Sequence, residues 1–113
     1  MTSALERFGV AFEAHDVDAI MAAMTDDCVF ESTGAPDGQR HVGQAAVRAA
    51  FTELFASSPD ARFTVEERIV AGDRVVDLWR YDWGGAEPGH VRGIDVFRLR
   101  DGLVAEKLSY VKG

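Results

Sequence analysis

The sequence is poor in cysteine and in clustered basic residues, and both shortages exclude classes of protein. Its single cysteine, Cys28, cannot form an intramolecular disulfide, and the apolar residues that follow it indicate a small buried side chain rather than a nucleophile. No run of Lys or Arg offsets the formal net charge of -7, so phosphate backbones and anionic lipid headgroups are repelled. No apolar stretch approaches the roughly 18 residues of a membrane span. We therefore expect a cytoplasmic protein that binds neither nucleic acid nor membranes.

Two further absences concern cofactors. No grouping of His, Cys, Asp and Glu has the spacing of metal ligands, and His41 and His90 fall in or beside expected loops. No glycine-rich phosphate loop follows an expected strand. The sequence therefore predicts neither a metal ion nor a nucleotide cofactor.

The chain is long enough for one hydrophobic core and too short for two. We expect a single domain over residues 1–113, of which 47% are apolar. Apolar residues recur at helical spacing in three segments of the first half, which begin at Thr2 or Ser3, at Asp16 and at Gly43. The first half therefore predicts three helices.

Strands dominate the second half of the sequence. Before it, a short strand over 28–31 and an irregular loop over 33–38 separate the second helix from the third. Alternating apolar residues and Gly-Asp or Asp-Gly turns then predict strands over 63–71, 75–83, 91–100 and 103–111. This order predicts an α+β fold with the helices on one face of a bent antiparallel sheet.

Three strings give the sequence a family resemblance: HDVDAI at 15–20, HVGQAAVR at 41–48 and GIDVFRLRDG at 93–102. With the order of elements, they resemble the nuclear-transport-factor-2-like (NTF2-like) superfamily, which includes ketosteroid isomerases, SnoaL-like polyketide cyclases and limonene epoxide hydrolases. The resemblance covers nearly the whole chain. It implies a cone-shaped, curved antiparallel sheet wrapped around three helices, with a blind apolar pocket. Candidate wall residues, which alternatively form only core, are Phe8, Phe12, Phe51, Phe55 and Phe97.

Asp95 is the most informative candidate for chemistry. Alternation along its strand places this carboxyl on the face that also carries Phe97, opposite Arg92 and Arg98. Burial in an apolar pocket favours the neutral acid, which can donate a hydrogen bond or a proton. The resemblance places Asp95 at the oxyanion-hole Asp of ketosteroid isomerases. The alternatives are an Asp paired with a buried Arg such as Arg80, or one that faces solvent.

The other isomerase positions are not matched. The resemblance places the catalytic Tyr at Phe8, which has no hydroxyl, and the general-base Asp at or beside Ser32. Ser32 is a candidate ligand contact, but it cannot act as a base at neutral pH without a partner. Glu31 can substitute for the base if a bulge turns it inward, or it is an exposed residue at the strand end.

Arg80 and Asp82 resemble the Arg-x-Asp pair of limonene epoxide hydrolases. Their spacing places both side chains on one face of a strand, where the Arg can orient a water-activating carboxylate. The second Asp of that family falls near Ser109 here. The alternative is a surface ion pair, because the opposite face of this strand is the more aromatic one.

Three functions are compatible with these residues. The first is a cofactor-independent enzyme in which Asp95 moves a proton on a hydrophobic carbonyl, enol or epoxide compound. The second is a binding or accessory domain with no catalysis. The third, compatible with either, is a homodimer formed through an aromatic row of Trp79, Tyr81 and Trp83.

Overall fold

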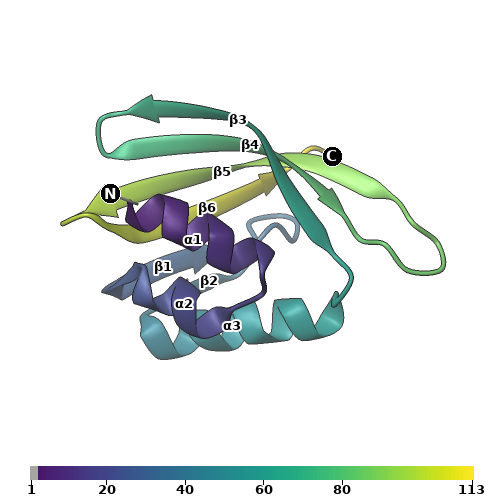
Figure 1. Cartoon of the computed structure of the whole chain (residues 1–113), viewed down its shortest axis with the longest axis horizontal. Helices are drawn as coiled ribbons and strands as arrows, with labels where there is room; N and C mark the ends of the chain where they lie inside the picture. The colour runs from purple at the N-terminus through teal and green to yellow at the C-terminus, as the bar shows by residue number, and fades with distance from the viewer. Residues whose placement is uncertain (1–2) are drawn as a thin grey trace.

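A computed structural model describes residues 3–113, which form three helices and six strands (Figure 1). The helices are α1 (Ala4–Glu13), α2 (Val17–Ala22) and α3 (Gln44–Ser57). The strands are β1 (Met24–Glu31), β2 (Arg40–Val42), β3 (Arg62–Ala71), β4 (Arg74–Asp82), β5 (His90–Arg100) and β6 (Leu103–Val111).

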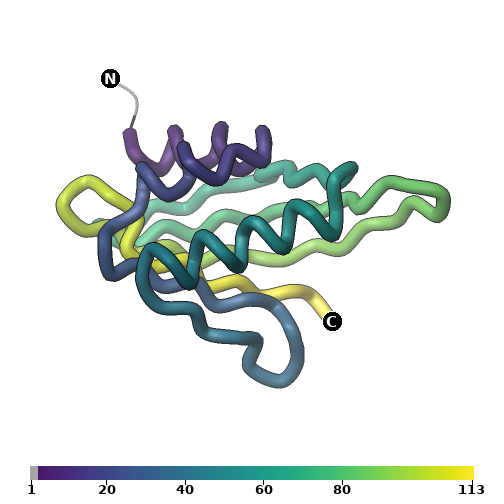
Figure 2. Tube along the Cα trace, turned by 90° about the horizontal axis from the view of Figure 1, so that it is seen from below, coloured from purple at the N-terminus to yellow at the C-terminus, as the bar shows by residue number. Residues whose placement is uncertain are grey.

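One curved sheet contains all six strands, in the order β2-β1-β6-β5-β4-β3. The three helices lie on its concave face, and α3 runs across that face in the view from below (Figures 1 and 2). The α+β architecture expected from the sequence is therefore confirmed. No helix within residues 3–113 is both long and apolar enough to cross a membrane.

The sheet is not antiparallel throughout. Strands β1 and β6 pair in parallel, whereas the other neighbouring strands pair antiparallel. Local sequence predicts hairpins well, but β1 and β6 come from opposite ends of the chain, and no turn signal announces their pairing. The short strand β2 was also missed, because it pairs only with β1.

The second helix is shorter and β1 longer than the sequence predicts. The expected strand began at Cys28, but β1 begins at Met24, directly after α2. The side-chain amide of Gln44 donates to the carbonyls of Met21, Met24 and Thr25, at 3.0–3.3 Å. These bonds satisfy one carbonyl in the last turn of α2 and two at the start of β1, so the chain passes from helix to strand without a loop.

Both predicted helix caps within the described residues are present. Ser3 Oγ accepts from the backbone N–H of Glu6, and Asp16 Oδ1 accepts from that of Ala19, each at 3.1 Å. The alternative cap, Thr2, lies outside the described residues. Side-chain oxygens in these positions satisfy amides that the first helical turn leaves unpaired.

Aromatic side chains fill much of the space between helices and sheet. Phe51 is fully buried and packs against Phe8, Phe12 and Phe30, with ring centroids 4.7–6.4 Å apart. Cys28 is also fully buried, and its burial raises the pKa of the thiol. A thiol held protonated in an apolar core is a structural residue, as the sequence indicated.

Candidate functional site

A cavity of about 390 Å³ lies between α1 and the concave face of the sheet. Its exposed residues come from α1 and from the edge strand β3, so the mouth opens between these two elements. Its buried residues come from α1, β4, β5 and β6 and form the floor. The floor residues are Leu5, Phe8, Phe12, Asp77, Trp79, Asp95, Phe97 and Lys107.

A relay of three polar side chains occupies the β5–β6 side of this floor. Lys107 Nζ donates to Ser109 Oγ at 2.9 Å, and Ser109 Oγ donates to Asp95 Oδ1 at 2.7 Å. Lys107 Nζ also lies 3.4 Å from the same carboxylate oxygen. No hydrogen bond among residues 3–113 reaches Asp95 Oδ2, and the Asp95 side chain keeps 11% of its surface accessible. One oxygen of Asp95 is thus fixed by the relay, and the other is available to a ligand.

The ammonium of Lys107 is surrounded by aromatic rings. Its Nζ lies 4.8 Å from the ring centroid of Phe30, 5.1 Å from that of Phe12 and 6.0 Å from that of Phe51. The faces of these rings attract a cation and replace part of the hydration that burial removes. Lys107, 4% exposed, is therefore held as a buried counter-charge to Asp95.

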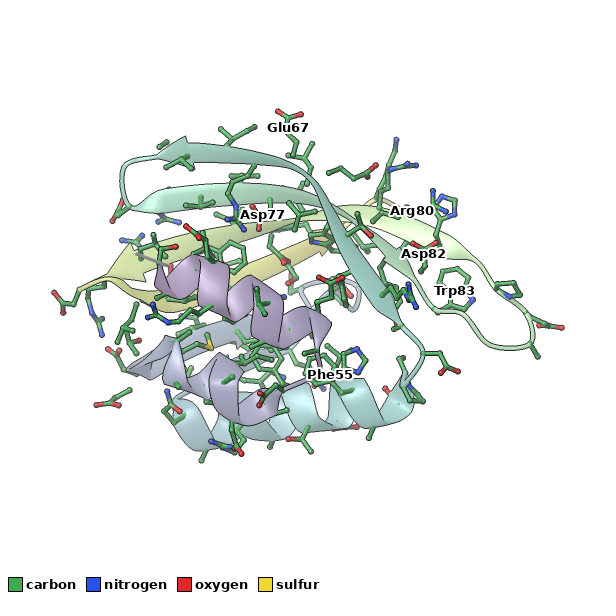
Figure 3. All side chains as sticks on the ribbon, in the orientation of Figure 1. Phe55, Glu67, Asp77, Arg80, Asp82 and Trp83 are labelled. Atoms are coloured by element: carbon green, nitrogen blue, oxygen red, sulfur yellow. The ribbon has the colours of Figure 1, made fainter. Side chains whose placement is uncertain are left out.

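A second ion pair lies beside the relay, on the neighbouring strands β3 and β4. Arg68 on β3 makes two hydrogen bonds to Asp77 on β4, at 2.7 and 2.8 Å. These bonds raise the pKa of the Arg68 guanidinium above its ordinary value. Asp77 is 3% exposed and faces the helices, whereas Glu67 points away from them (Figure 3).

Strand register explains why the two pairs share one floor. Arg68 is opposite Asp77, Asp77 is opposite Asp95, and Asp95 is opposite Ser109. Directly opposed residues point to the same face, so these side chains form a row across four strands. The row contains two carboxylates and, with Lys107, two cations. The charges of the site therefore balance internally.

The structure places four of the predicted residues in the cavity. Asp95, Phe8, Phe12 and Phe97 all line it. Phe51 and Phe55 instead lie in the core outside it, where Phe55 packs against Phe12. Asp95 neither pairs with Arg80 nor faces solvent, which were the two alternatives to a site residue. Its partners are Lys107 and Ser109.

Four other predicted site residues lie outside the cavity. Glu31 forms an ion pair with Arg40 at 2.7 Å, and Ser32 lines a separate shallow depression. Arg80 and Asp82 bind each other at 3.1 Å on the outer face of β4, away from α1 (Figure 3). The hydrogen bonds from Arg80 lower the pKa of Asp82, which makes this carboxylate a weaker base. The structure does not bring these four residues together with Asp95.

Sequence reasoning missed Lys107, Arg68 and Asp77 as site residues. A usable signal existed for two of them. Lys107 alternates with Ala105 and Ser109, and Asp77 lies between Val75 and Trp79, so each is a charge on a strand face that is otherwise apolar or small. Arg68 gave no such signal, because a bulge between Val65 and Glu67 shifts the register of β3.

The described residues offer no evident metal site. No group of three or more His, Cys, Asp or Glu side chains within 3–113 gathers closely enough to hold an ion. The two buried carboxylates of the cavity, Asp77 and Asp95, are already paired with cations.

Comparison with known proteins identifies the family. Residues 5–107 match the SnoaL-like domain family. The chain belongs to this family. Among curated proteins, none matches this SnoaL-like chain. An NTF2-like protein of unknown function from Mesorhizobium loti is 40% identical to it, with a TM-score of 0.83, and the match covers 97% of this chain and 88% of that one.

More distant structures share the fold of this SnoaL-like chain. TerC, co-crystallised with polyporic acid, is 18% identical, with a TM-score of 0.83 and coverage of 96% of this chain and 88% of that one. A putative polyketide cyclase from Xanthomonas campestris pv. campestris is 21% identical, with a TM-score of 0.76 and coverage of 96% and 87%. At these identities the likeness establishes the architecture alone.

The aromatic row on β4 of the SnoaL-like fold does not form the exposed stripe expected from the sequence. Trp79 is 5% exposed and lines the cavity, and Tyr81 is half-buried against Phe63. Only Trp83 is exposed, beside the long β4–β5 loop (Figure 3). Trp79 and Tyr81 therefore do not offer the exposed surface on which the expected dimer through this row depends.

Proposed function

We propose that this protein binds a small apolar carbonyl or enol compound in the α1–β3 cavity and that Asp95 transfers a proton on it without a cofactor. The observation that carries this proposal is the unpaired oxygen of Asp95, a residue that lines the largely apolar cavity, while Ser109 and Lys107 hold its other oxygen. A positioned carboxylate with water largely excluded suits general acid–base catalysis. Two fold neighbours, TerC with polyporic acid and a putative polyketide cyclase, support an organic ligand.

The proposed step begins with proton abstraction. Asp95 Oδ2 takes a proton from the carbon next to the carbonyl, and the electron pair of that C–H bond forms an enolate. Where the enolate is conjugated with a C=C bond, return of the proton from Asp95 to the far carbon completes an isomerisation. Where the enolate carbon attacks a second carbonyl, the alkoxide that forms takes the proton from Asp95 and completes a ring closure. Both outcomes use the same base, so the cavity shape decides between them.

Lys107 and Ser109 act as positioning residues in this scheme. The hydroxyl of Ser109 fixes Asp95 Oδ1, and the ammonium of Lys107 balances the negative charge that is passed between carboxylate and enolate. A fixed positive charge in a site of low polarity stabilises such charge more strongly than water does.

Asp95→Asn is expected to slow deuterium uptake at the α-carbon of 2-tetralone roughly 100-fold or more, because the amide cannot accept the proton. The exchange is followed by proton NMR in heavy water, and it reports enolisation whatever the later reaction is. Asp95→Asn combined with Lys107→Met removes both charges and provides a balanced variant that should also be inactive.

Matched controls remove a carboxylate outside the cavity. Glu31→Gln and Asp82→Asn should exchange 2-tetralone at the rate of the unchanged protein, because their side chains pair with Arg40 and Arg80 on the surface. Equal losses in these controls and in Asp95→Asn would contradict the proposed role of Asp95.

A ligand-binding domain without catalysis is the second candidate. The observation that favours it is the internal balance of charge, since Lys107 already neutralises Asp95 and Arg68 neutralises Asp77. Saturable binding of 2-tetralone with no exchange above the rate in buffer would establish this alternative.

We also propose a homodimer, now placed on the outer face of the sheet. This face carries no helix within residues 3–113, and its strands present apolar side chains: Ile69, Val76, Leu78, Ile94, Val96, Leu108 and Tyr110. Packing against a second copy removes this apolar surface from water, which contributes a favourable free energy of about 25 cal/mol per Å² buried. Sedimentation velocity at micromolar concentration should detect a dimer that Ile94→Lys dissociates. A monomer for the unchanged protein would refute the proposal.

A further inference from the structure

Arg68 carries a hydrogen-bond donor that has no partner in the described part of the chain. Its Nε and Nη2 donate to the two carboxylate oxygens of Asp77, at 2.7 and 2.8 Å, and no hydrogen bond within residues 3–113 uses Nη1. Asp77 is 3% exposed and lies on the cavity floor, so a guanidinium bonded to it lies over that floor. The Arg68 side chain keeps 33% of its surface accessible. A ligand in the cavity can therefore reach this guanidinium.

Strand register makes the guanidinium a neighbour of the proposed base. Arg68 is opposite Asp77, and Asp77 is opposite Asp95. Side chains that are directly opposed have Cβ atoms about 5 Å apart. The groups that hold Asp95 Oδ1, Ser109 and Lys107, both belong to β6, on the other side of β5 from Asp77. The occupied oxygen of Asp95 thus faces β6, and the guanidinium lies on the β4 side.

A ketone fits between these two groups. A hydrogen bond of about 3 Å to the carbonyl oxygen, and a similar approach of the base to the adjacent carbon, span one strand spacing. Lys107 is less suited to bind the carbonyl, because its ammonium donates to Ser109, contacts Asp95 Oδ1 and is enclosed by aromatic rings.

The charge of Arg68 is already compensated before a ligand binds. Its hydrogen bonds to Asp77, with the charges of Asp77 and Glu6, raise the pKa of the guanidinium, which therefore stays protonated. Glu13 also lines the cavity. With these carboxylates nearby, the site attracts a free anion weakly, whereas a neutral ketone meets no repulsion. The charge that develops on the ketone oxygen comes from Asp95, so the total charge of the cavity stays constant during proton abstraction.

We infer that Arg68 Nη1 donates a hydrogen bond to the carbonyl oxygen of a neutral ketone and stabilises the enolate that forms when Asp95 Oδ2 removes the adjacent proton. This inference rests on the proposed function, from which it takes the cavity and the base. Asp77 acts as a positioning residue, because it holds the other side of the guanidinium. A donor fixed where charge develops stabilises the transition state more than it stabilises the bound ketone.

The rate of deuterium uptake by 2-tetralone, measured over a range of concentrations, tests this role. Arg68→Gln with Asp77→Asn replaces the ion pair by two amides and leaves no unpaired charge. This variant is expected to lower the saturating rate roughly 100-fold, while the half-saturating concentration changes less than about threefold. The matched control, Arg98→Gln with Glu106→Gln, neutralises an ion pair on the outer face and should exchange at the rate of the unchanged protein.

Two further measurements separate a direct contact from a structural role. Arg68→Lys keeps a cation beside Asp77 but lacks the planar fork and Nη1, and it should lose roughly tenfold in the saturating rate. It also keeps the inference testable should the double variant fail to fold. In infrared spectra, carbonyl-labelled 2-tetralone should absorb at lower frequency in the unchanged protein than in Arg68→Gln with Asp77→Asn, because a hydrogen bond from Nη1 weakens the C=O bond.

The outcomes against the inference differ in what they say of the proposed function. A full saturating rate in Arg68→Lys or in the double variant, or an unshifted carbonyl band, would overturn the role of Arg68. The proposed function would still stand if Asp95→Asn loses the exchange. An unchanged protein that does not accelerate the exchange would overturn the proposed catalysis, and the role of Arg68 with it.

Discussion

Lys107→Met is expected to destabilise the protein by about 3–5 kcal/mol, the largest effect of any single substitution in the site. The replacement has nearly the same length, so the rings of Phe12, Phe30 and Phe51 keep an apolar neighbour. The cost arises because Asp95, 7% exposed, loses the cation that balances its charge. Urea unfolding at neutral pH, followed by circular dichroism, measures the difference.

Two further variants make this expectation specific to the buried pair. Adding Asp95→Asn to Lys107→Met should recover most of the lost stability, because no unpaired charge remains. Arg98→Met removes a cation from the outer face, where the guanidinium is 42% exposed beside Glu106, and should cost less than about 1 kcal/mol. A Lys107→Met protein as stable as the unchanged one would show that Asp95 is not held as a carboxylate.

Gly93→Ala should destabilise the protein by about 2–3 kcal/mol and distort the cavity. The new methyl group would collide with the backbone oxygen of Tyr110 and with the indole of Trp79, and the backbone oxygen cannot move without breaking the β5–β6 pairing. Thermal unfolding and binding of 2-tetralone should both show the loss.

Gly9→Ala is the opposite control on the other wall of the same cavity. Gly9 lies inside α1 at the mouth, and an added Cβ meets nothing within 4 Å. Alanine in a helix interior is favoured over glycine by about 0.5–1 kcal/mol, so this variant should be more stable. Losses of similar size in Gly9→Ala and Gly93→Ala would contradict the packing described for Trp79.

The elements that the sequence predicted are those defined by local physics. Helix caps at Ser3 and Asp16 and the hairpins of β3 to β6 depend on residues that are close in the chain, and all are present. The parallel pairing of β1 with β6 depends on two distant segments. Nothing in either segment specifies its partner, so the sequence left the sheet incompletely described.

The site shows the same division. Alternation along β5 placed Asp95 and Phe97 on the inner face, and the structure has them there. The partner of Asp95 was missed, because the choice between Arg80 and Lys107 depends on strand order and register rather than on spacing. The side chain of Arg80 points to the outer face of β4. The side chain of Lys107 points to the inner face of β6, the strand next to that of Asp95.

The parallel pairing of β1 with β6 has a consequence for the folding of the buried ion pair between Asp95 and Lys107. Asp95 and Lys107 belong to one hairpin, which closes a short loop and can form early in folding. The rings around Lys107 come from α1, β1 and α3, and β1 reaches β6 only after most of the chain has been brought together. We therefore expect the two charges to meet while still hydrated, so that the cost of their burial falls after the folding barrier and raises the rate of unfolding.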